Sequence, residues 1–379
     1  MGNIIRPLSD VASWIASENL WIESSALQQL NHTASLPGML RVVGMPDLHP
    51  GRGYPIGAAC FSAGRFYPAL VGNDIGCGMG LWQTDLVARR LNLDKLEKRL
   101  QGMADIAASS WLDERLEDDF YRHPFRAALG SIGGGNHFAE FQQVETLLDS
   151  DVASQAGVQV HQLLLLVHSG SRGVGQHILQ HHITRFSHHG LEIGSPEAQR
   201  YLRDHDAALA FARLNRQLIA GRLLEQFRAQ GERLLDLFHN LLEPAQLGDI
   251  QGILHRKGAT PSDKGLVILP GSRGDYSYLL QPTACEQSLW SLAHGAGRKW
   301  MRTECKGRLS AKFSPQQLSR TALGSRVICR DRQLIYEEAP QAYKSVDSVL
   351  DCLVQAGLAK PVARLRPLLT WKTSGERSA

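Results

Sequence analysis

An acidic residue and a thiol lie three positions apart in the glycine-rich stretch NDIGCGMG, which follows the apolar run PALVG. These are Asp74 and Cys77. Thiolates bind metal ions strongly and carboxylates suit harder cations, so this pair could form half of a divalent metal site. The alternative is that Cys77 is a small buried side chain and Asp74 a turn former. An isolated pair of this kind leaves both interpretations open.

Four histidines occur close to glycine. His137 lies in GGGNHFAE, His168 in HSGSRG, His255 in HRKGA and His294 in HGAGR. A single histidine is more often a packed or surface residue than a ligand, but four at glycine-bearing breaks make that explanation weaker. Neutral imidazoles are common metal ligands, which makes these residues candidates for a metal site.

Arg172 follows His168, Arg298 follows His294, and Arg273 lies in the related loop PGSRGDYSY. A guanidinium next to exposed backbone N–H groups is suited to phosphate oxygens. A metal ion beside such an anion site indicates phosphoryl or nucleotidyl transfer, and a histidine that is not a ligand could be the nucleophile. Residue types and spacing do not decide which histidine that is.

The chain has 379 residues, of which 43% are hydrophobic and 21% charged, with a formal net charge of +4. This composition is typical of a globular protein with a sizeable core, and the small net charge restricts any polyanion site to a local patch. No run approaches the about 18 apolar residues of a membrane span, and the N-terminus has no secretory pattern. We therefore expect a cytoplasmic protein without membrane contact. The six cysteines include no Cys-x-x-Cys pair, which argues against a disulfide framework and a structural zinc site.

Short apolar runs separated by Gly and Pro predict strands over residues 38–80. Helical spacing of apolar residues predicts helices in 91–116 and over 197–241. Buried strands are expected in 156–168 and in 265–279, each leading into a Gly-Ser-Arg-Gly loop. These elements predict an α+β fold, with mixed sheets flanked by helices and the site in glycine-rich loops at strand ends. No linker divides the chain, so we expect one domain over 1–379.

In this order, the loops resemble the RtcB family of RNA-splicing ligases. The resemblance covers roughly residues 38–372 and rests on MPDLHPGRGYPIG, NDIGCGMG, GGGNHFAE, HSGSRG, HRKGA, PGSRGDYSY, HGAGR and EEAPQAYKSVDSVL. Eight ordered motifs are far more specific than any one of them. The resemblance implies a GTP- and Mn²⁺-dependent ligase that joins an RNA 3′-phosphate, or a 2′,3′-cyclic phosphate after opening, to a 5′-hydroxyl.

The resemblance also implies roles for individual residues. His294 would attack the α-phosphorus of GTP and carry GMP as a phosphoramidate. Cys77 would bridge two manganese ions, with Asp74 and His137 on the first and His168 and His255 on the second. Thiolate and imidazole favour Zn²⁺ over Mn²⁺ by intrinsic affinity, so the choice of manganese depends on the family and on metal availability.

Further residues would surround the nucleotide and the substrate phosphate. Arg172 and Asn136 would contact substrate phosphate. By the same resemblance, the nucleotide site would comprise Asn136, His137, Phe138, Glu140, His255, Arg256, Pro270, Gly271, Ser272, Arg273, Ser277, His294, Gly295, Ala296, Gly297 and Lys372.

The chain also departs from the family pattern. Arg273 and Asp275 stand where the family usually has Met and Thr, and KWMRTECKGRLS follows Arg298. These departures suit a paralogous branch associated with a release-factor-like partner and with repair of cleaved tRNA or rRNA, and an activating protein could be needed. Two other function classes remain: a metal-dependent phosphoesterase, which needs no GTP, and a non-catalytic protein that binds RNA ends.

Overall fold

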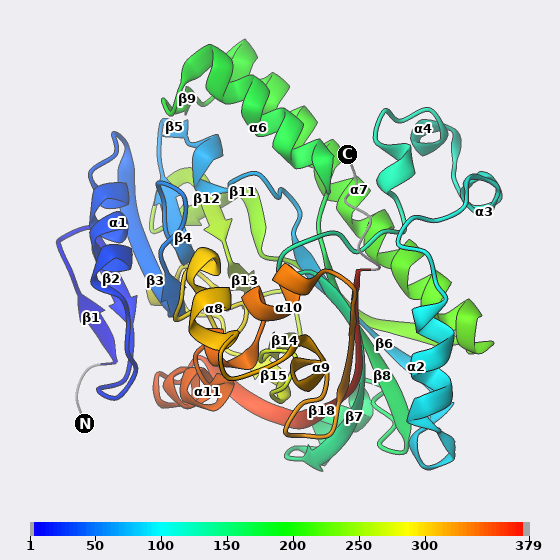
Figure 1. Cartoon of the computed structure of the whole chain (residues 1–379). Helices are drawn as coiled ribbons and strands as arrows, with labels where there is room; N and C mark the ends of the chain where they lie inside the picture. Colours follow the sequence, from blue (N-terminus) through cyan, green and yellow to red (C-terminus); the bar gives the residue numbers. More distant parts are fainter. Residues whose placement is uncertain (1–3, 374–379) are drawn as a thin grey trace.

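The computed structural model describes residues 4–373 (Figure 1). Two large sheets form its centre. The first has the strand order β1 (Ile5–Pro7), β2 (Ala12–Ile15), β3 (Met39–His49), β4 (Ile56–Ser62), β12 (Ile250–Lys257), β11 (Asn240–Leu247). The second has the order β10 (Gly231–Phe238), β6 (Gly78–Val87), β8 (Gln162–Ser169), β7 (Phe138–Leu147), β18 (Ala359–Thr373), β15 (Ser277–Pro282), β14 (Val267–Pro270), and β17 (Arg326–Cys329) pairs with β18.

Both sheets are mixed. The β2–β3 and β17–β18 pairs are parallel, and the other pairs of the two large sheets are antiparallel. Two short ribbons join β13 (Ala259–Pro261) to β16 (Ser291–Ala293) and β5 (Arg65–Phe66) to β9 (Leu191–Glu192). The α+β class is therefore confirmed, whereas the assignment of 1–379 to one domain stays a prediction.

Helices flank the sheets (Figure 1). They are α1 (Ser24–Ala34), α2 (Leu93–Gln101), α3 (Ser109–Asp113), α4 (Asp118–Tyr121), α5 (Ser150–Gln155), α6 (Gly173–Phe186), α7 (Pro196–Phe227), α8 (Arg302–Leu309), α9 (Pro315–Leu318), α10 (Arg332–Glu337) and α11 (Val346–Gln355). Among residues 4–373, no helix is long and apolar enough to cross a membrane.

The long helix α7 is shorter than the predicted 197–241. Ser195 caps its N-terminus by accepting a hydrogen bond from the Ala198 N–H, and Pro196 occupies the first turn. It ends at Phe227 because Arg228 adopts a left-handed conformation with φ of 55°. The chain then enters β10, which pairs with β6, so 231–238 was wrongly predicted as helix.

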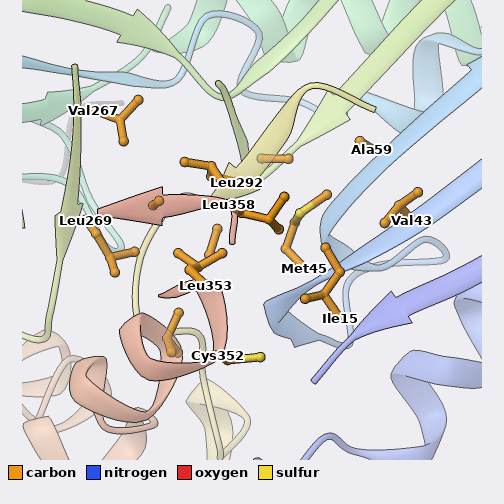
Figure 2. Packing of buried hydrophobic residues seen from close by; sticks show 14 of the residues in the cluster. Ile15, Val43, Met45, Ala59, Val267, Leu269, Leu292, Cys352, Leu353 and Leu358 are labelled. Atoms are coloured by element: carbon orange, nitrogen blue, oxygen red, sulfur yellow. The ribbon is translucent and has the colours of Figure 1, made fainter. Parts of the chain in front are cut away.

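A hydrophobic cluster joins the two sheets and includes residues of the ribbon β13–β16 (Figure 2). Val43 and Met45 of β3 belong to this cluster, and so do Val267 and Leu269 of β14. Helix α11 closes it with Cys352 and Leu353, so this cysteine serves as a small apolar side chain. Leu292, Ala293 and Ala296 belong to the same cluster. Residue 294 therefore leaves β16 at a position fixed by packing on both sides.

Candidate metal and nucleotide site

The structure brings a thiol, a carboxylate and imidazoles together at the ends of β6, β7 and β8. Sγ of Cys77 lies 3.3 Å from Nε2 of His137 and 3.2 Å from Nε2 of His168. Oδ2 of Asp74 lies 2.8 Å from Nε2 of His137. Strand register accounts for this proximity, because Met79 of β6 and Phe138 of β7 both pair with His168 of β8.

A third histidine completes the cluster. Nε2 of His239, in the link between β10 and β11, lies 3.3 Å from Nε2 of His168. Two groups of possible metal ligands result, Asp74–Cys77–His137 and Cys77–His168–His239, and the ligand atoms of each lie within 4.8 Å of one another. The two groups share Cys77, so a thiolate there could bridge two ions.

The prediction that His255 belongs to this cluster is wrong in this structure. Its Nε2 accepts a hydrogen bond of 2.9 Å from the Tyr67 N–H, and its Nδ1 lies 3.1 Å from the Cys60 carbonyl oxygen. Both ring nitrogens are thus occupied by backbone groups, and no lone pair remains for a metal ion. His239 takes the place that the sequence interpretation gave to His255.

The electrostatics of the cluster suit cation binding. Burial lowers the pKa of His168 and of His239 well below the usual range, which keeps both imidazoles neutral. Burial would raise the pKa of Asp74, but neighbouring His137 holds it below its usual value. Burial has the largest effect on the Cys77 thiol and raises its pKa, and the nearby Asp74 carboxylate raises it further. A divalent cation would reverse that last shift and bind the thiolate, with release of a proton.

Two buried polar atoms of the cluster have no hydrogen-bond partner among the described residues. They are Oδ1 of Asp74 and Nδ1 of His137. Unsatisfied buried polar atoms are costly, so their presence beside a thiol and neutral imidazoles favours an ion at this point. The donor set fits a pair of divalent cations.

Two polar side chains of α7 hold the loops of the cluster in place. The side chain of Asn215 donates to the carbonyl oxygens of Ser131 and Gly170 and accepts from the Gly130 N–H. Nη1 of the neighbouring Arg216 donates to the carbonyl oxygens of Gly76 and Ser169, each at 2.9 Å. Neither residue was predicted from the sequence, because polar residues within a helical pattern are expected at the surface.

His294 lies next to this cluster. Its ring is 4.8 Å from that of His239, measured between centroids. Its Nδ1 lies 2.6 Å from Oδ2 of Asp47, a fully buried carboxylate of β3, and the same oxygen accepts the His294 backbone N–H. A carboxylate at Nδ1 holds the proton there, so the lone pair is on Nε2. Asp47 lies within the motif MPDLHPGRGYPIG but had no assigned role.

Asp47 is itself held from both sides. Nζ of buried Lys344 donates to the carbonyl oxygens of Pro46 at 3.1 Å and Leu48 at 2.9 Å. Nδ1 of His49 lies 2.9 Å from the Asp47 carbonyl oxygen. Burial lowers the pKa of Lys344 to about 8 and that of His49 to about 3.

Arg172 lines a cavity of about 380 Å³ beside the cluster. The residue has a φ of 56°, a strained conformation for a side chain other than glycine. Its guanidinium lies over Gly133, where a Cβ atom would come within 1.6 Å of Nη1, so only glycine fits there. Nε of Arg172 donates to Ser131 at 3.3 Å. The cavity is lined by Asp105, Ile106, Ser131, Ile132, Gly133, Gly134, Gly135, Arg172, Asp331, Gln333, Leu334, Glu337, Lys372 and Thr373.

Several predicted nucleotide residues gather along β7, β15 and β18. Phe138 packs edge-on against His168, with ring centroids 5.6 Å apart. The carboxylate of buried Glu140 accepts hydrogen bonds from Gln142 and Thr370, and Gln142 also donates to Oγ of Ser277 at 2.8 Å. Burial raises the pKa of Glu140 to about 7.

A buried ionic group lies at the end of β18. Glu338 accepts from Arg298, Arg302 and Tyr343, and its Oε2 is 3.7 Å from Nζ of Lys372. Burial would raise the pKa of Glu338, but these cations lower it far below the usual range. Arg298 also donates to the Glu337 carbonyl, so its guanidinium is engaged by protein groups and does not form the predicted anion site.

The remaining predicted nucleotide residues are Arg256, Arg273, Asn136 and the segments 270–272 and 295–297. Arg256 pairs with Glu243 and donates to Oγ of Ser291 and to the Trp290 carbonyl, which gives it a structural role instead of the predicted nucleotide contact. Arg273 is buried, donates to the Ile335 carbonyl at 2.7 Å through Nη2 and leaves Nε and Nη1 without a described partner. The Asn136 carbonyl lies 3.2 Å from Nδ1 of His168. Pro270 is the last residue of β14, Gly271 and Ser272 follow it, and Gly295, Ala296 and Gly297 follow His294.

The sequence is similar to those of known proteins over nearly its whole length. The family description "tRNA-splicing ligase RtcB" matches residues 29–123 and 106–373. The chain is 67% identical over 375 residues to "RNA-splicing ligase RtcB2" of Escherichia coli, covering 99% of both chains. It is 31% identical to "RNA-splicing ligase RtcB" of Mycobacterium tuberculosis, covering 90% of this chain and 99% of that protein. It is also 31% identical to "tRNA-splicing ligase RtcB" of Nanoarchaeum equitans, covering 92% of both. With its Cys77 cluster and His294 in place, the chain belongs to the RtcB family of tRNA-splicing ligases.

Proposed function

We propose that this protein joins an RNA 3′-phosphate, or a 2′,3′-cyclic phosphate, to a 5′-hydroxyl, with GTP as the second substrate and two Mn²⁺ ions as cofactors. The observation that carries the proposal is the position of His294. Its Nδ1 is held by Asp47, and its ring packs against His239 of the cluster. A nucleophile oriented by a carboxylate beside a cation site is suited to nucleotidyl transfer.

The ions would be held by the two groups that share Cys77, with Asp74 and His137 on one and His168 and His239 on the other. Divalent ions there would polarise phosphoryl oxygens and offset negative charge that develops during transfer. The carboxylate of Asp74 is the hardest ligand of the set and favours Mn²⁺ relative to an all-sulfur, all-nitrogen site.

Covalent transfer would proceed in balanced steps. Nε2 of His294 attacks the α-phosphorus of GTP, an N–P bond forms, and pyrophosphate leaves. An oxygen of the RNA 3′-phosphate then attacks that phosphorus, the N–P bond breaks, and the RNA carries GMP on its end. The 5′-hydroxyl attacks the RNA phosphorus, a phosphodiester forms, and GMP leaves. A cyclic phosphate first takes up water to give the 3′-phosphate. Asp47 holds the Nδ1 proton through the first two transfers.

The substrates would bind on either side of His294. Arg172, with Asn136, would hold the RNA phosphate at the cavity lined by Gly133–Gly135. Phe138, Glu140, Ser277 and Lys372 would contact the nucleotide, together with the backbone that follows Pro270 and His294. A raised pKa near 7 allows Glu140 to be protonated or ionised as the base requires. The RNA that is mended, a release-factor-like partner and an activating protein stay predictions from the resemblance.

The test is protein labelling by GTP that carries ³²P at the α-phosphate, with Mn²⁺ present. We expect a covalent, acid-labile band on denaturing gels that disappears in His294→Ala. His255→Ala serves as the matched control and should retain the band, since His255 bonds only to backbone groups. No band in the wild-type protein with Mn²⁺ bound, but release of phosphate from RNA ends, would indicate the phosphoesterase instead. Metal binding with neither activity would indicate an RNA-end-binding protein.

A further inference from the structure

One side chain joins the loop of the metal ligands to the turn between β12 and β13. Asn240 is the first residue of β11 and follows the possible ligand His239. Its Nδ2 donates to the Asp74 carbonyl oxygen at 3.0 Å, and its Oδ1 accepts from the Gly258 N–H at 2.8 Å. A single amide therefore spans the gap between these two segments, and both of its polar ends are used.

Main-chain hydrogen bonds hold the same segments together. The Gly76 N–H donates to the Asn240 carbonyl oxygen and the His239 N–H to that of Cys77, each at 2.8 Å. The Ala259 N–H donates to the His239 carbonyl oxygen at 3.1 Å. These bonds do not involve the Asn240 side chain, so they remain when it is replaced. A substitution at this position therefore tests the amide, with the main-chain bonds around it kept in place.

The turn at Gly258 lies directly against the ring of His294. Ala259 of β13 pairs with Ala293 of β16, which places Gly258 opposite His294. A Cβ atom on Gly258 would lie 2.9 Å from Cε1 of His294, and its φ of 66° also favours glycine. The imidazole is thus held on two sides, by the Asp47 carboxylate at Nδ1 and by the Gly258 backbone at Cε1. A shift of Gly258 would change the direction in which Nε2 points.

We propose that Asn240 is a positioning residue for nucleotidyl transfer, which sets the spacing between the metal-ligand loop and Nε2 of His294. The inference rests on the proposed function, because it needs a phosphorus that is held beside the ligand loop and attacked by His294. Attack requires the reacting atoms to lie about 3–3.5 Å apart, and a displacement of about 1 Å costs on the order of 100-fold in rate. Since Asn240 bonds to both segments, it fixes the spacing on which that rate depends.

A positioning role of this kind has its own kinetic signature. The first two transfers of the proposed reaction form and break the bond to Nε2 of His294. The last transfer, in which the 5′-hydroxyl attacks RNA that already carries GMP, does not involve His294. Loss of the Asn240 amide should therefore slow the first two transfers and leave the last at the wild-type rate. A residue that only supported the ligand loop would affect all three.

The experiment uses the full chain with Mn²⁺ and two variants, Asn240→Ala and Asn240→Asp. The first removes both hydrogen bonds of the amide, and the second keeps the acceptor for the Gly258 N–H but loses the donor to the Asp74 carbonyl oxygen. Single-turnover labelling by GTP with ³²P at the α-phosphate should fall about 10- to 100-fold in both variants. The Mn²⁺ content should stay at the wild-type level, because every ligand side chain remains. Joining of RNA prepared with GMP on its 3′-phosphate should proceed at the wild-type rate.

The matched control is Asn92→Ala. Oδ1 of Asn92 accepts from the Lys95 N–H at 3.1 Å at the start of α2, so this variant also loses a bond between an asparagine side chain and the backbone. It should be labelled as fast as the wild type. Normal labelling in both Asn240 variants would overturn the inference, and so would equal losses in all three transfers or in the control.

A second readout needs neither GTP nor RNA. In protein that carries ¹³C-labelled histidine and is loaded with Co²⁺, the ring signal of His294 is assigned by its absence in His294→Ala. The shift that Co²⁺ induces in this signal depends on the distance and direction from the ion, so it should differ between Asn240→Ala and the wild type. Equal shifts would overturn the inference. Absence of labelling in the wild type would contradict only the proposed function, because the Co²⁺ measurement does not depend on it.

Discussion

His168 and His239 approach each other with their Nε2 atoms 3.3 Å apart, and Sγ of Cys77 lies 3.2 Å from the first of them. One imidazole comes from the end of β8 and the other from the link between β10 and β11. Strands β8 and β10 are separated by β6 in the sheet, so the pair depends on the correct folding of three strands. A metal site built in this way binds its ion only after the sheet has formed.

His239→Ala should lower the Mn²⁺ content of the protein from two ions per chain toward one. The substitution removes one of three donors from the group Cys77–His168–His239 and leaves Asp74–Cys77–His137 complete. Metal per chain, measured by mass spectrometry after chelation and reloading, checks this result. Labelling by GTP should fall with the metal content.

The control for that variant is His255→Ala. The metal content should stay at the wild-type level, but stability should fall by about 1–3 kcal/mol for each buried backbone group that loses its partner, because the Tyr67 N–H and the Cys60 carbonyl are no longer bound by the ring. Thermal unfolding measures this loss. If His255→Ala lost metal while His239→Ala retained it, the second ligand group would be assigned wrongly.

Asp47→Asn should slow labelling of His294 by roughly 100-fold or more, although the side chain keeps its shape. An amide at this position no longer fixes the proton on Nδ1 and does not stabilise positive charge on the ring. Single-turnover labelling with excess GTP gives the rate. Asp263→Asn, at an exposed surface ion pair with Lys264, is the matched control and should be labelled normally. A normal rate in Asp47→Asn would show that the contact with His294 is not used.

Glu338→Gln should destabilise the protein by about 3–5 kcal/mol, since Arg298, Arg302 and Lys372 would keep their charges in a buried place without the carboxylate that they share. The midpoint of urea unfolding measures the change. Glu192→Gln provides the comparison, because Glu192 is 76% exposed and its pair with Arg65 should contribute less than about 1 kcal/mol. Equal midpoints for the two variants would contradict a structural role for Glu338.

Much of the site could be predicted because glycine marks the loops that carry it. Asp74, Cys77, His137 and His168 each stand at a glycine-bearing strand end, and the structure brings all four together. His239 has no glycine beside it. The residues before His239 form an apolar stretch that ends in His-Asn, similar to the apolar strand that ends in His168. Because helical spacing was assigned to the whole of 197–241, this strand was not predicted.

The errors at His255 and Arg256 have another cause. Both were placed by the motif HRKGA, yet β12 pairs with β4 in a register that turns His255 toward the Cys60 carbonyl and leaves Arg256 facing Ser291. Which hydrogen bonds a ring or guanidinium makes depends on neighbours that are distant in sequence. Asp47 and Lys344 could not be assigned for the same reason, since their partners lie 247 and 298 residues away in the chain.

Glu140→Gln should change how stability depends on pH. Burial raises the pKa of Glu140 from 4.5 to about 7, so the folded protein retains a proton that the unfolded chain has released over this interval. The contribution of this group is therefore fully present below pH 4.5 and is lost as the pH rises through 7, with a total of about 3 kcal/mol. The free energy of unfolding of the metal-free variant should rise relative to that of the wild type as the pH increases, by a total of about 3 kcal/mol. Urea unfolding at pH 5, 6, 7 and 8 measures this difference. Parallel curves would mean that Glu140 ionises at its ordinary pKa in the folded protein, and that the neighbouring Thr370, Gln142 and Lys372 fully offset its burial.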